Sequence, residues 1–415
     1  MSAMADGIQR LVVVGGSLAG LRAAEAARQA GFTGDITVVS AEEEHPYDRP
    51  ALSKQCLLEG VEAPTLRDDD PATGLGVTWL AGHGATGLDT SARQVVVGEQ
   101  RVDYDALVIA TGTRPRQLPG LPAAAGIVTL RDARDVPALR AGLGPGKRLT
   151  IIGAGIIGAE IATAARKLGA EVTLIEAAPV PLQRALGRHL GLLFSEWHGE
   201  SGVDLRLGAS VQAVQADNGA VARVVLGDGS VIPTDTLLVS IGVVPNTEWL
   251  VGSGVELAGD GSVLCDEFLE TSVPGVFAAG DVISWPNAHT GLTARLETWT
   301  SANEQGSAAG ENAVVRVEDR QPYSTVPYFW SDWYGHRIQF TGVVTDREPE
   351  VVFGSVESRK WVALFEDGGR VVGALAVNEP SKIMKDRRRI REGMSWEEAR
   401  EIYRALSARV AVGAS

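Results

Sequence analysis

Cysteine is scarce in this chain: Cys56 and Cys265 are the two cysteines in 415 residues, and they are far apart. They form no C-x-x-C or C-x4-C pair, which argues against a dithiol relay beside a cofactor and against a disulfide reductase. Two cysteines and six scattered histidines show none of the ligand spacings of zinc sites, so we expect no metal centre. Cys56, close to Lys54, is either a redox thiol or a small semi-buried side chain.

Long apolar runs and an excess of positive charge are also lacking. No run reaches the roughly 18 apolar residues that a membrane-spanning helix needs, and MSAMADGIQR lacks the basic-then-apolar pattern of a secretion signal. We therefore expect a soluble, cytoplasmic protein. The formal charge of −14 argues against nucleic acid and anionic membranes as general partners. At about 150 residues per domain, the length suggests about three domains.

Glycine, by contrast, is abundant, and two glycine-rich turns organise the chain. The first, LVVVGGSLAG at 11–20, follows an apolar β-run. We expect a helix over 18–30, ended by Gly31, and a second strand at 35–40. Such a strand, turn and helix bind a dinucleotide pyrophosphate on backbone N–H groups at the helix N-terminus. Ser17 stands where the middle glycine belongs, which weakens the motif without removing it.

The second turn, LTIIGAGIIGAE at 149–160, has the full G-x-G-x-x-G pattern. We expect a helix over 156–168, ended by Gly169, and then a strand that ends at Glu176. A carboxylate there can accept hydrogen bonds from both ribose hydroxyls and repels a 2′-phosphate, so this site favours NAD(H) over NADP(H). Strand, turn, helix, strand and acid occur in order twice, which indicates two bound nucleotides rather than one nucleotide and an ordinary glycine-rich turn.

Further motifs connect the chain to a known family. RPALSK at 49–54, LETW at 296–299 and PYFWSD at 327–332 are narrow motifs, whereas ATG at 110–112 and GD at 280–281 are shared with many two-dinucleotide flavoproteins. With these motifs the chain resembles the FAD-dependent, NADH-dependent ferredoxin reductases of the pyridine nucleotide-disulphide oxidoreductase superfamily. The resemblance is to the putidaredoxin reductase and biphenyl dioxygenase reductase types and covers essentially the whole chain.

The resemblance implies a set of FAD contacts. Backbone N–H groups of the first turn would bind the pyrophosphate, with charge-assisted bonds from Arg49 and Arg131, and Asp281 would accept from a ribityl hydroxyl. The family usually has an acid for the adenosine ribose where this chain has Ala41; Glu42, the next residue, substitutes if the loop shifts by one. The implied FAD contacts are Gly15, Ser17, Ala19, Gly20, Glu42, Arg49, Lys54, Ala85, Ala110, Thr111, Gly112, Arg131, Gly280, Asp281, Glu297, Thr298, Trp299 and Trp330.

The resemblance also implies catalytic and NAD contacts. The lysine of RPALSK would point at the flavin N5 edge and the glutamate after the second turn would face the nicotinamide, so that Lys54 and Glu160 pair; alternatively, both are surface residues. Glu297 is implied near both rings. Trp330 is implied near the flavin where electrons leave, although the aromatic cluster at 328–336 is otherwise typical of a core. The implied NAD contacts are Gly153, Gly155, Ile156, Ile157, Gly158, Glu160, Glu176, Arg184 and Gly242.

The predicted fold class is α/β, with two Rossmann-like dinucleotide-binding domains, for FAD and NAD, plus a C-terminal α+β domain. We expect a discontinuous FAD domain at 1–116 and 246–323, an NAD domain at 117–245, and the C-terminal domain at 324–415. Ser301 and Glu304 predict a capping box that starts a helix, with its positive end toward the flavin. The C-terminal domain should hold short alternating strands, a hairpin turn at Asp367 and Gly368, and a last helix capped by Ser395 and Glu398.

The activity implied by the resemblance is that of a ferredoxin–NAD(+) reductase. FAD accepts a hydride from NADH and passes single electrons to a [2Fe–2S] ferredoxin that feeds a cytochrome P450 or ring-hydroxylating oxygenase. Docking an acidic ferredoxin on this acidic chain requires a local basic area. The dense basic run at 382–393 is either that area or a solvated helix face; its candidate docking residues are Lys385, Arg387, Arg388, Arg389 and Arg391.

Alternative functions keep the same architecture. A reductase of rubredoxin or of another electron carrier would differ at the docking face. A slow FAD- and NADH-binding interaction protein of the apoptosis-inducing-factor type would use the C-terminal module as a nucleotide-controlled surface. An NADH oxidase or peroxidase would need a redox cysteine at the flavin, and the loop SAEEEHPY has none.

Overall fold

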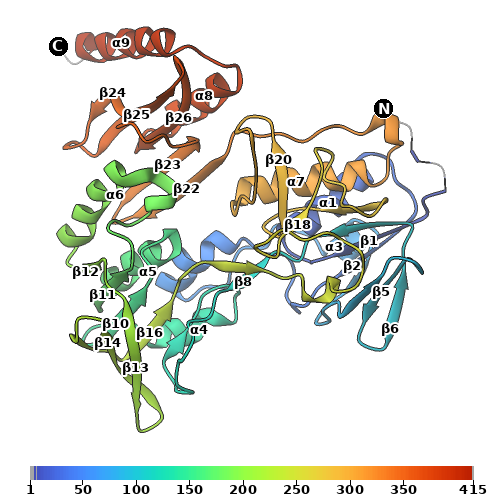
Figure 1. Ribbon diagram of the computed structural model, residues 1–415, viewed down its shortest axis with the longest axis horizontal. Helices are drawn as coiled ribbons and strands as arrows, with labels where there is room; N and C mark the ends of the chain where they lie inside the picture. Colours follow the sequence, from blue (N-terminus) through green and yellow to red (C-terminus); the bar gives the residue numbers. More distant parts are fainter. Residues whose placement is uncertain (1–3, 6, 414–415) are drawn as a thin grey trace. The chain divides into compact units, whose positions relative to one another are not determined.

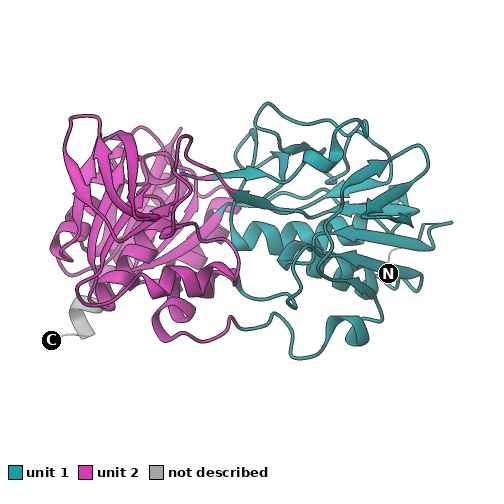
Figure 2. Cartoon of the chain, turned by 90° about the horizontal axis from the view of Figure 1, so that it is seen from below, with its two compact units in different colours: residues 1–48, 64–114, 243–327 teal, residues 49–63, 115–242, 328–415 magenta. Residues whose placement is uncertain are grey.

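The computed structural model describes residues 4–5 and 7–413, and the chain falls into two compact units (Figure 2). Unit 1 comprises 1–48, 64–114 and 243–327, and unit 2 comprises 49–63, 115–242 and 328–415. Each unit holds one of the two glycine-rich turns, and residues after 327 group with the second turn. The boundaries of the expected three domains stay a prediction.

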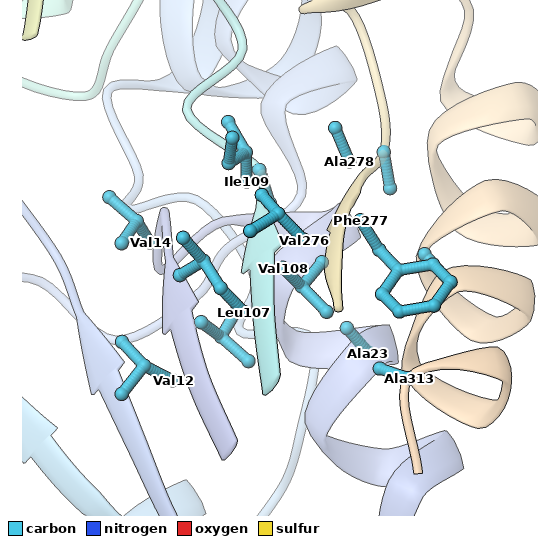
Figure 3. Close-up of a cluster of buried hydrophobic side chains, with 14 of the residues drawn as sticks. Val12, Val14, Ala23, Leu107, Val108, Ile109, Val276, Phe277, Ala278 and Ala313 are labelled. Atoms are coloured by element: carbon cyan, nitrogen blue, oxygen red, sulfur yellow. The ribbon is translucent and has the colours of Figure 1, made fainter. Parts of the chain in front are cut away.

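Unit 1 is built on a parallel sheet in the order β19–β7–β1–β2–β3 (Figure 1). Its strands are β1 (Arg10–Val14), β2 (Asp35–Val39), β3 (Thr78–Leu80), β7 (Ala106–Ile109) and β19 (Val276–Ala278). The helices α1 (Leu18–Gln29) and α7 (Trp299–Asn312) pack closely on each other, since a Cβ on Gly306 would lie 2.3 Å from the Ala19 oxygen. Figure 3 shows Phe277 of β19 next to Ala23 and Ala313, in the apolar core between the sheet and these helices.

Smaller elements complete unit 1. One antiparallel sheet contains β4 (Gly87–Asp89), β5 (Gln94–Val97) and β6 (Gln100–Asp103), and another sheet contains β18 (Val263–Leu264), β20 (Ile283–Asn287) and β21 (Leu292–Ala294). The short helix α3 (Pro71–Gly74) precedes β3. The chain passes between the units at β8 (Thr113–Pro115) and just before β17 (Val243–Pro245), and these two strands pair with each other.

The nucleotide part of unit 2 repeats this plan with a parallel sheet in the order β12–β11–β10–β16–β9. The strands are β9 (Ile127–Val128), β10 (Arg148–Ile152), β11 (Glu171–Glu176), β12 (Asp204–Leu207) and β16 (Thr236–Val239). Its helices are α2 (Leu57–Glu59), α4 (Asp135–Ala141), α5 (Ile156–Lys167) and α6 (Gln183–Glu200), and an antiparallel sheet contains β13 (Val211–Asp217), β14 (Ala220–Leu226) and β15 (Val231–Pro233). The two βαβ units predicted from the glycine-rich turns are therefore present.

The C-terminal part of unit 2 is an antiparallel sheet in the order β22–β23–β26–β25–β24 with two helices after it. Its elements are β22 (Tyr328–Trp333), β23 (His336–Gly342), β24 (Glu350–Ser355), β25 (Lys360–Asp367), β26 (Arg370–Val377), α8 (Pro380–Arg391) and α9 (Trp396–Gly413). Figure 1 shows α8 and α9 on one side of this sheet and α6 on the other. The predicted fold class, with two parallel dinucleotide sheets and an α+β module, is confirmed.

The predicted strands of this module are present, and one local prediction needs correction. Along β25, Trp361 packs in one core with residues of α6, and Val362 packs in another with residues of α9. Alternate side chains of this strand therefore enter two separate cores, because helices cover both faces of the sheet. The hairpin turn consists of Gly368 and Gly369, both with positive φ, while Asp367 still pairs within the sheet.

The last helix begins as predicted. The Ser395 hydroxyl accepts a hydrogen bond from the Glu398 N–H at 3.3 Å, at the start of α9. Within the described residues, no helix combines the length and the apolar character needed to cross a bilayer.

Candidate dinucleotide-binding sites

The first glycine-rich turn packs so tightly that two of its glycines leave no space for a side chain. A Cβ on Gly15, whose φ is +123°, would lie 2.1 Å from the Ala110 oxygen, and one on Gly20 would lie 1.8 Å from the Gly15 oxygen. Ser17 is the N-cap of α1 and has extended backbone geometry. The first N–H groups of a helix have no partner within it, so this turn can bind an anion.

Three of the segments implied for FAD meet at the carboxyl edge of the unit 1 sheet, because β19, β7 and β1 are neighbours. The Ala110 N–H donates to the Val14 oxygen at 2.7 Å, which keeps the ends of β7 and β1 together. The first turn, residues 110–112 and residues 280–281 therefore lie along one edge. Ligands of open α/β sheets bind at such an edge.

A fully buried glutamine at this edge has an unused donor. The Oε1 atom of Gln305 on α7 accepts a hydrogen bond from the Gly280 N–H at 2.9 Å, and the side chain is 0% exposed. Its Nε2 atom has no hydrogen-bond partner within the part of the chain that the structure describes. Because buried amide groups are normally satisfied, this donor fits a ligand oxygen beside the turn that carries Asp281. The residues present therefore fit a bound dinucleotide such as FAD.

The loop after β2 contains Ala41, at the position where the resembling family usually has an acidic residue. Ala41 is exposed, whereas Glu42 is half-buried and its carboxylate accepts a hydrogen bond from the Tyr47 hydroxyl at 2.6 Å. The loop that leads to Ala85 runs beside this strand end, since a Cβ on Gly84 would lie 3.7 Å from the Ala41 side chain. Gly84, the neighbour of Ala85, thus lies close to Ala41, and the contact of Glu42 with a ribose stays a prediction.

The start of α7 corrects the predicted capping box. The N-cap is Thr298, whose Oγ1 accepts a hydrogen bond from the Ser301 N–H at 3.1 Å, so the helix begins three residues earlier than expected. Glu304 accepts from the Thr325 hydroxyl at 2.8 Å, within unit 1, and so acts far from the cap. Sequence reasoning missed Thr298 because both it and Ser301 are good N-cap residues.

The side chains on either side of this N-cap have partners of their own. Glu297 is 43% exposed and forms an ion pair with Arg295 at 3.0 Å. The Trp299 Nε1 atom donates to the Asp48 carboxylate at 2.9 Å. Their implied roles at the flavin stay predictions.

Four of the residues implied for FAD, Arg49, Lys54, Arg131 and Trp330, lie in unit 2. Arg49 Nη1 donates to the Arg131 carbonyl oxygen at 2.7 Å, so the two arginines are neighbours. Trp330 is half-buried on β22, whereas Tyr328 and Trp333 of the same strand are buried. The aromatic cluster is therefore largely core, with Trp330 partly accessible.

The second glycine-rich turn combines tight packing with open space. A Cβ on Gly153, whose φ is +105°, would lie 2.2 Å from the Ser240 oxygen, and one on Gly158 would lie 2.1 Å from the Gly153 oxygen. Nothing described lies within 4 Å of a Cβ built on Gly155, which is the N-cap of α5. The backbone is thus open at the helix N-terminus, where a pyrophosphate binds in Rossmann folds.

Glu176, another residue implied for NAD, contacts this turn directly. The two carboxylate oxygens of Glu176 accept hydrogen bonds from the Ala154 N–H at 2.8 Å and the Ala178 N–H at 2.9 Å. This arrangement fixes the acid directly against the turn. Gly242 has a φ of +91°, and Arg184 is exposed at the start of α6.

The Lys54 and Glu160 side chains form an ion pair in unit 2, with 2.7 Å between Nζ and Oε1. Glu160 lies on α5 and is 3% exposed, so the alternative that both are surface residues is wrong. Lys54 lies in a π-helical segment, Leu52–Cys56, with φ of −116° and ψ of −106°. π-Helical segments are rare in proteins, and many of those that occur lie at functional sites.

Sequence reasoning missed two further partners of this carboxylate. The Ser53 hydroxyl donates to Glu160 Oε2 at 2.5 Å, and the Ser331 hydroxyl donates to Oε1 at 2.6 Å. A buried carboxylate needs several donors, so a search for hydroxyl residues within the family motifs RPALSK and PYFWSD could have found them.

The two cysteines form no disulfide, and both are buried. Cys56 ends the same π-helical segment as Lys54, and burial raises the pKa of the Cys265 thiol well above its ordinary range. Among the described residues, no group of three or more His, Cys, Asp or Glu side chains is arranged to hold a metal ion.

Comparisons with known proteins agree with this geometry. The description of the pyridine nucleotide-disulphide oxidoreductase family matches residues 9–306, and that of the reductase C-terminal domain matches residues 328–407. Rhodocoxin reductase from Rhodococcus erythropolis is 35% identical over 383 residues, which cover 91% of this chain and 88% of the relative. The ferredoxin–NAD(+) reductase subunit of the benzene 1,2-dioxygenase system from Pseudomonas putida is 35% identical over 376 residues, 89% of each chain.

A solved structure extends the likeness. The covalent putidaredoxin reductase–putidaredoxin complex aligns with a TM-score of 0.88 at 27% identity, covering 96% of this chain and 99% of that chain. The likeness includes both glycine-rich turns and the C-terminal module. As predicted from the sequence, the chain belongs to the pyridine nucleotide-disulphide oxidoreductase family.

Proposed function

We propose that this protein is an NADH-dependent ferredoxin reductase. It binds FAD through the first glycine-rich turn and NADH through the second, and it delivers electrons to a [2Fe–2S] ferredoxin that serves a cytochrome P450 or a ring-hydroxylating oxygenase. The observation that carries the proposal is the pair of dinucleotide turns in one chain, in which Gly15 and Gly153 exclude a side chain and Gly155 leaves the helix N-terminus open. The two relatives named above are a rhodocoxin reductase and a ferredoxin–NAD(+) reductase subunit, and this chain aligns with each of them over most of its length.

FAD, when bound, supplies the exchange between two electrons taken together as hydride and single electrons given to an iron–sulfur protein. The protein's own groups hold and orient the reactants. The Gln305 Nε2 donor and the turn at 280–281 suit the polar part of FAD, and the buried ion pair of Lys54 with Glu160 supplies a fixed cation for the reacting end.

Preference for NADH follows from Glu176. Its carboxylate is held by the backbone of Ala154 and Ala178, so it cannot easily move aside for a 2′-phosphate. A fixed negative charge at the end of this strand repels NADPH and accepts from the ribose hydroxyls of NADH.

The ferredoxin would dock on the exposed face of α8. Some basic residues of the run at 382–393 are partly buried, which leaves fewer candidates for docking. Arg389 is largely buried and pairs with Asp386 at 2.9 Å, and the Arg387 guanidinium lies 5.7 Å from the Tyr328 ring centroid. The exposed basic residues of the run are Lys385, Arg388 and Arg391, and Arg388 forms an ion pair with the exposed Glu392 at 3.6 Å. Residues three or four apart lie on the same face of a helix, so Arg388 shares a face with Met384, Lys385 and Arg391. The positive charge on this face suits an acidic partner.

We further propose a cytoplasmic location. The two cysteines form no disulfide, as is usual in reducing compartments.

The test uses the purified protein with FAD bound. NADH should reduce the flavin rapidly and NADPH slowly, and reduction of cytochrome c should require an added [2Fe–2S] ferredoxin. A protein that binds no flavin after reconstitution contradicts the proposal. A rubredoxin reductase would instead respond to rubredoxin in the same assay, and an interaction protein of the apoptosis-inducing-factor type would turn over slowly with every one-electron acceptor.

A further inference from the structure

The buried carboxylate of Glu160 has three described donors, which come from two distant parts of the chain. Lys54 and Ser331 bond Oε1 at 2.7 and 2.6 Å, and Ser53 bonds Oε2 at 2.5 Å. Ser53 and Lys54 are sequence neighbours, whereas Ser331 is on β22 of the C-terminal module. A carboxylate with a donor set on each oxygen cannot rotate without breaking a hydrogen bond.

A second side chain of β22 controls the direction of the Ser331 hydroxyl. The Trp333 Nε1 atom lies 2.7 Å from Ser331 Oγ, and both residues are buried, at 0% and 1% exposed. An indole N–H can only donate, so the Ser331 oxygen accepts from it. The hydroxyl hydrogen of Ser331 is then left to point at Glu160. The chain of donors runs from Trp333 through Ser331 to Glu160.

A buried tryptophan of this module does not need such a hydrogen bond. Trp361, on β25 of the same sheet, is also fully buried in the same apolar core as Trp333. Its Nε1 atom has no hydrogen-bond partner in the part of the chain that the structure describes. The core therefore accepts an unpaired indole, and packing alone does not require the bond from Trp333 to Ser331.

We propose that Ser331 and Trp333 are positioning residues for electron transfer from NADH: through Glu160 they hold the Lys54 ammonium in place. This inference rests on the proposed function, because it assumes that Lys54 acts beside the bound FAD. Lys54 is 25% exposed, and its ammonium lies 2.7 Å from Glu160 Oε1 and donates a longer bond, of 3.4 Å, to the Pro50 carbonyl oxygen. Glu160 is the charged and closer of these two partners, so the orientation of its carboxylate has the larger effect on where the ammonium lies. Charge-assisted hydrogen bonds of this kind are the strong ones, and the loss of one donor shifts the pair.

The experiment compares four variants of the FAD-loaded protein with the unaltered protein. Ser331→Ala removes the donor to Glu160, Ser331→Thr restores a hydroxyl, Trp333→Phe removes the bond that directs it, and Trp361→Phe removes an equally buried indole without a partner. The rate of flavin reduction by NADH, its dependence on pH, the KM for NADH and the midpoint potential of the bound flavin are measured for each.

We expect Ser331→Ala and Trp333→Phe to slow flavin reduction about tenfold, with KM for NADH nearly unchanged, since the loss corresponds to one hydrogen bond to a charged group. Both should shift the midpoint potential in the same direction, because a displaced cation stabilises the reduced flavin differently. Ser331→Thr and Trp361→Phe should behave like the unaltered protein.

The proposal is overturned if Ser331→Ala and Trp333→Phe match Trp361→Phe in rate, pH profile and potential. If Trp333→Phe does not fold, the pair Ser331→Ala and Ser331→Thr decides the question: recovery with threonine supports positioning, and no difference between them contradicts it. Failure of this inference is distinguishable from failure of the proposed function, because the proposed function is tested on the unaltered protein, by electron transfer from NADH to a ferredoxin.

Discussion

The Tyr403 hydroxyl on α9 donates a 2.5 Å hydrogen bond to the Asp386 carboxylate on α8, and both side chains are buried. Burial raises the pKa of Asp386, while the bonds from Tyr403 and Arg389 oppose that rise. This contact joins the last two helices across an otherwise apolar core.

Replacing Tyr403 with Phe should therefore destabilise the C-terminal module. The variant leaves a buried carboxylate oxygen without its hydroxyl donor, which costs about 1–3 kcal/mol of unfolding free energy. Denaturant unfolding followed by circular dichroism measures the change. Tyr104→Phe is the matched control, because the Tyr104 hydroxyl is buried without a described partner and its loss should be nearly neutral. Equal stability of the two variants would contradict the prediction.

Stability should fall as the pH drops below about 6.5, because of His198. Its Nδ1 atom lies 2.6 Å from the Tyr334 hydroxyl, and burial lowers its pKa to about 4. The unfolded chain binds this proton near pH 6.5 and the folded chain near pH 4, so the unfolded state gains protons first on acidification. The loss between these values amounts to about 3 kcal/mol.

Thermal unfolding at pH 7 and pH 5 measures this effect, with His198→Gln as the comparison. The variant keeps a hydrogen-bonding side chain but cannot titrate, so its stability should change less between the two pH values. A His198→Gln protein with the same pH dependence as the unaltered one would show that other groups are responsible.

Two glycines of the second turn should respond differently to alanine. Gly153→Ala places a Cβ 2.2 Å from the Ser240 oxygen at a positive φ, so it should cost more than about 1 kcal/mol of stability. Gly155→Ala meets open space and should fold normally, yet weaken NADH binding about tenfold because the pyrophosphate must approach that backbone. Thermal unfolding and NADH titration separate the two effects. Normal NADH affinity in Gly155→Ala would argue against a pyrophosphate at this turn.

Glu176→Gln should reduce the preference for NADH over NADPH about tenfold, since the repulsion of a 2′-phosphate is lost. The ratio of kcat/KM for the two nucleotides is the measurement. Glu171→Gln, at the exposed start of the same strand, is the control and should leave the ratio unchanged. An unchanged ratio in Glu176→Gln would mean that another residue selects the nucleotide.

Charge reversal on α8 should slow reduction of the ferredoxin and leave electron transfer from NADH to ferricyanide unchanged. The double variant Lys385→Glu, Arg388→Glu alters two exposed charges and keeps the half-buried Arg389, and a loss of about tenfold or more is expected at low salt. Arg101→Glu, exposed on β6, is the control. Loss of both activities together would indicate damage to the enzyme rather than to docking.

Much of the fold could be predicted because its signals are local. Gly31 and Gly169 end the helices after the two turns with positive φ, as predicted, and residues 35–39 and 171–176 form the next strands. A glycine-rich turn needs few other residues to specify its backbone, so motif and structure agree at both sites.

The prediction of caps and turns from the sequence was wrong at two places where neighbouring residues suit the same role. Thr298 rather than Ser301 caps α7, and Gly369 rather than Asp367 completes the hairpin. In each case neighbouring residues suit the same role, and the packing of the surrounding elements selects one of them.

The sequence by itself determined that this chain has two dinucleotide turns, an acid at the end of the second βαβ unit, and no paired cysteines. Only the tertiary structure decided which side chains surround Glu160, because Ser53 and Ser331 are 107 and 171 residues away along the chain. The physical reason is that a turn depends on its own backbone geometry, whereas a buried charge depends on whichever donors the fold brings to it.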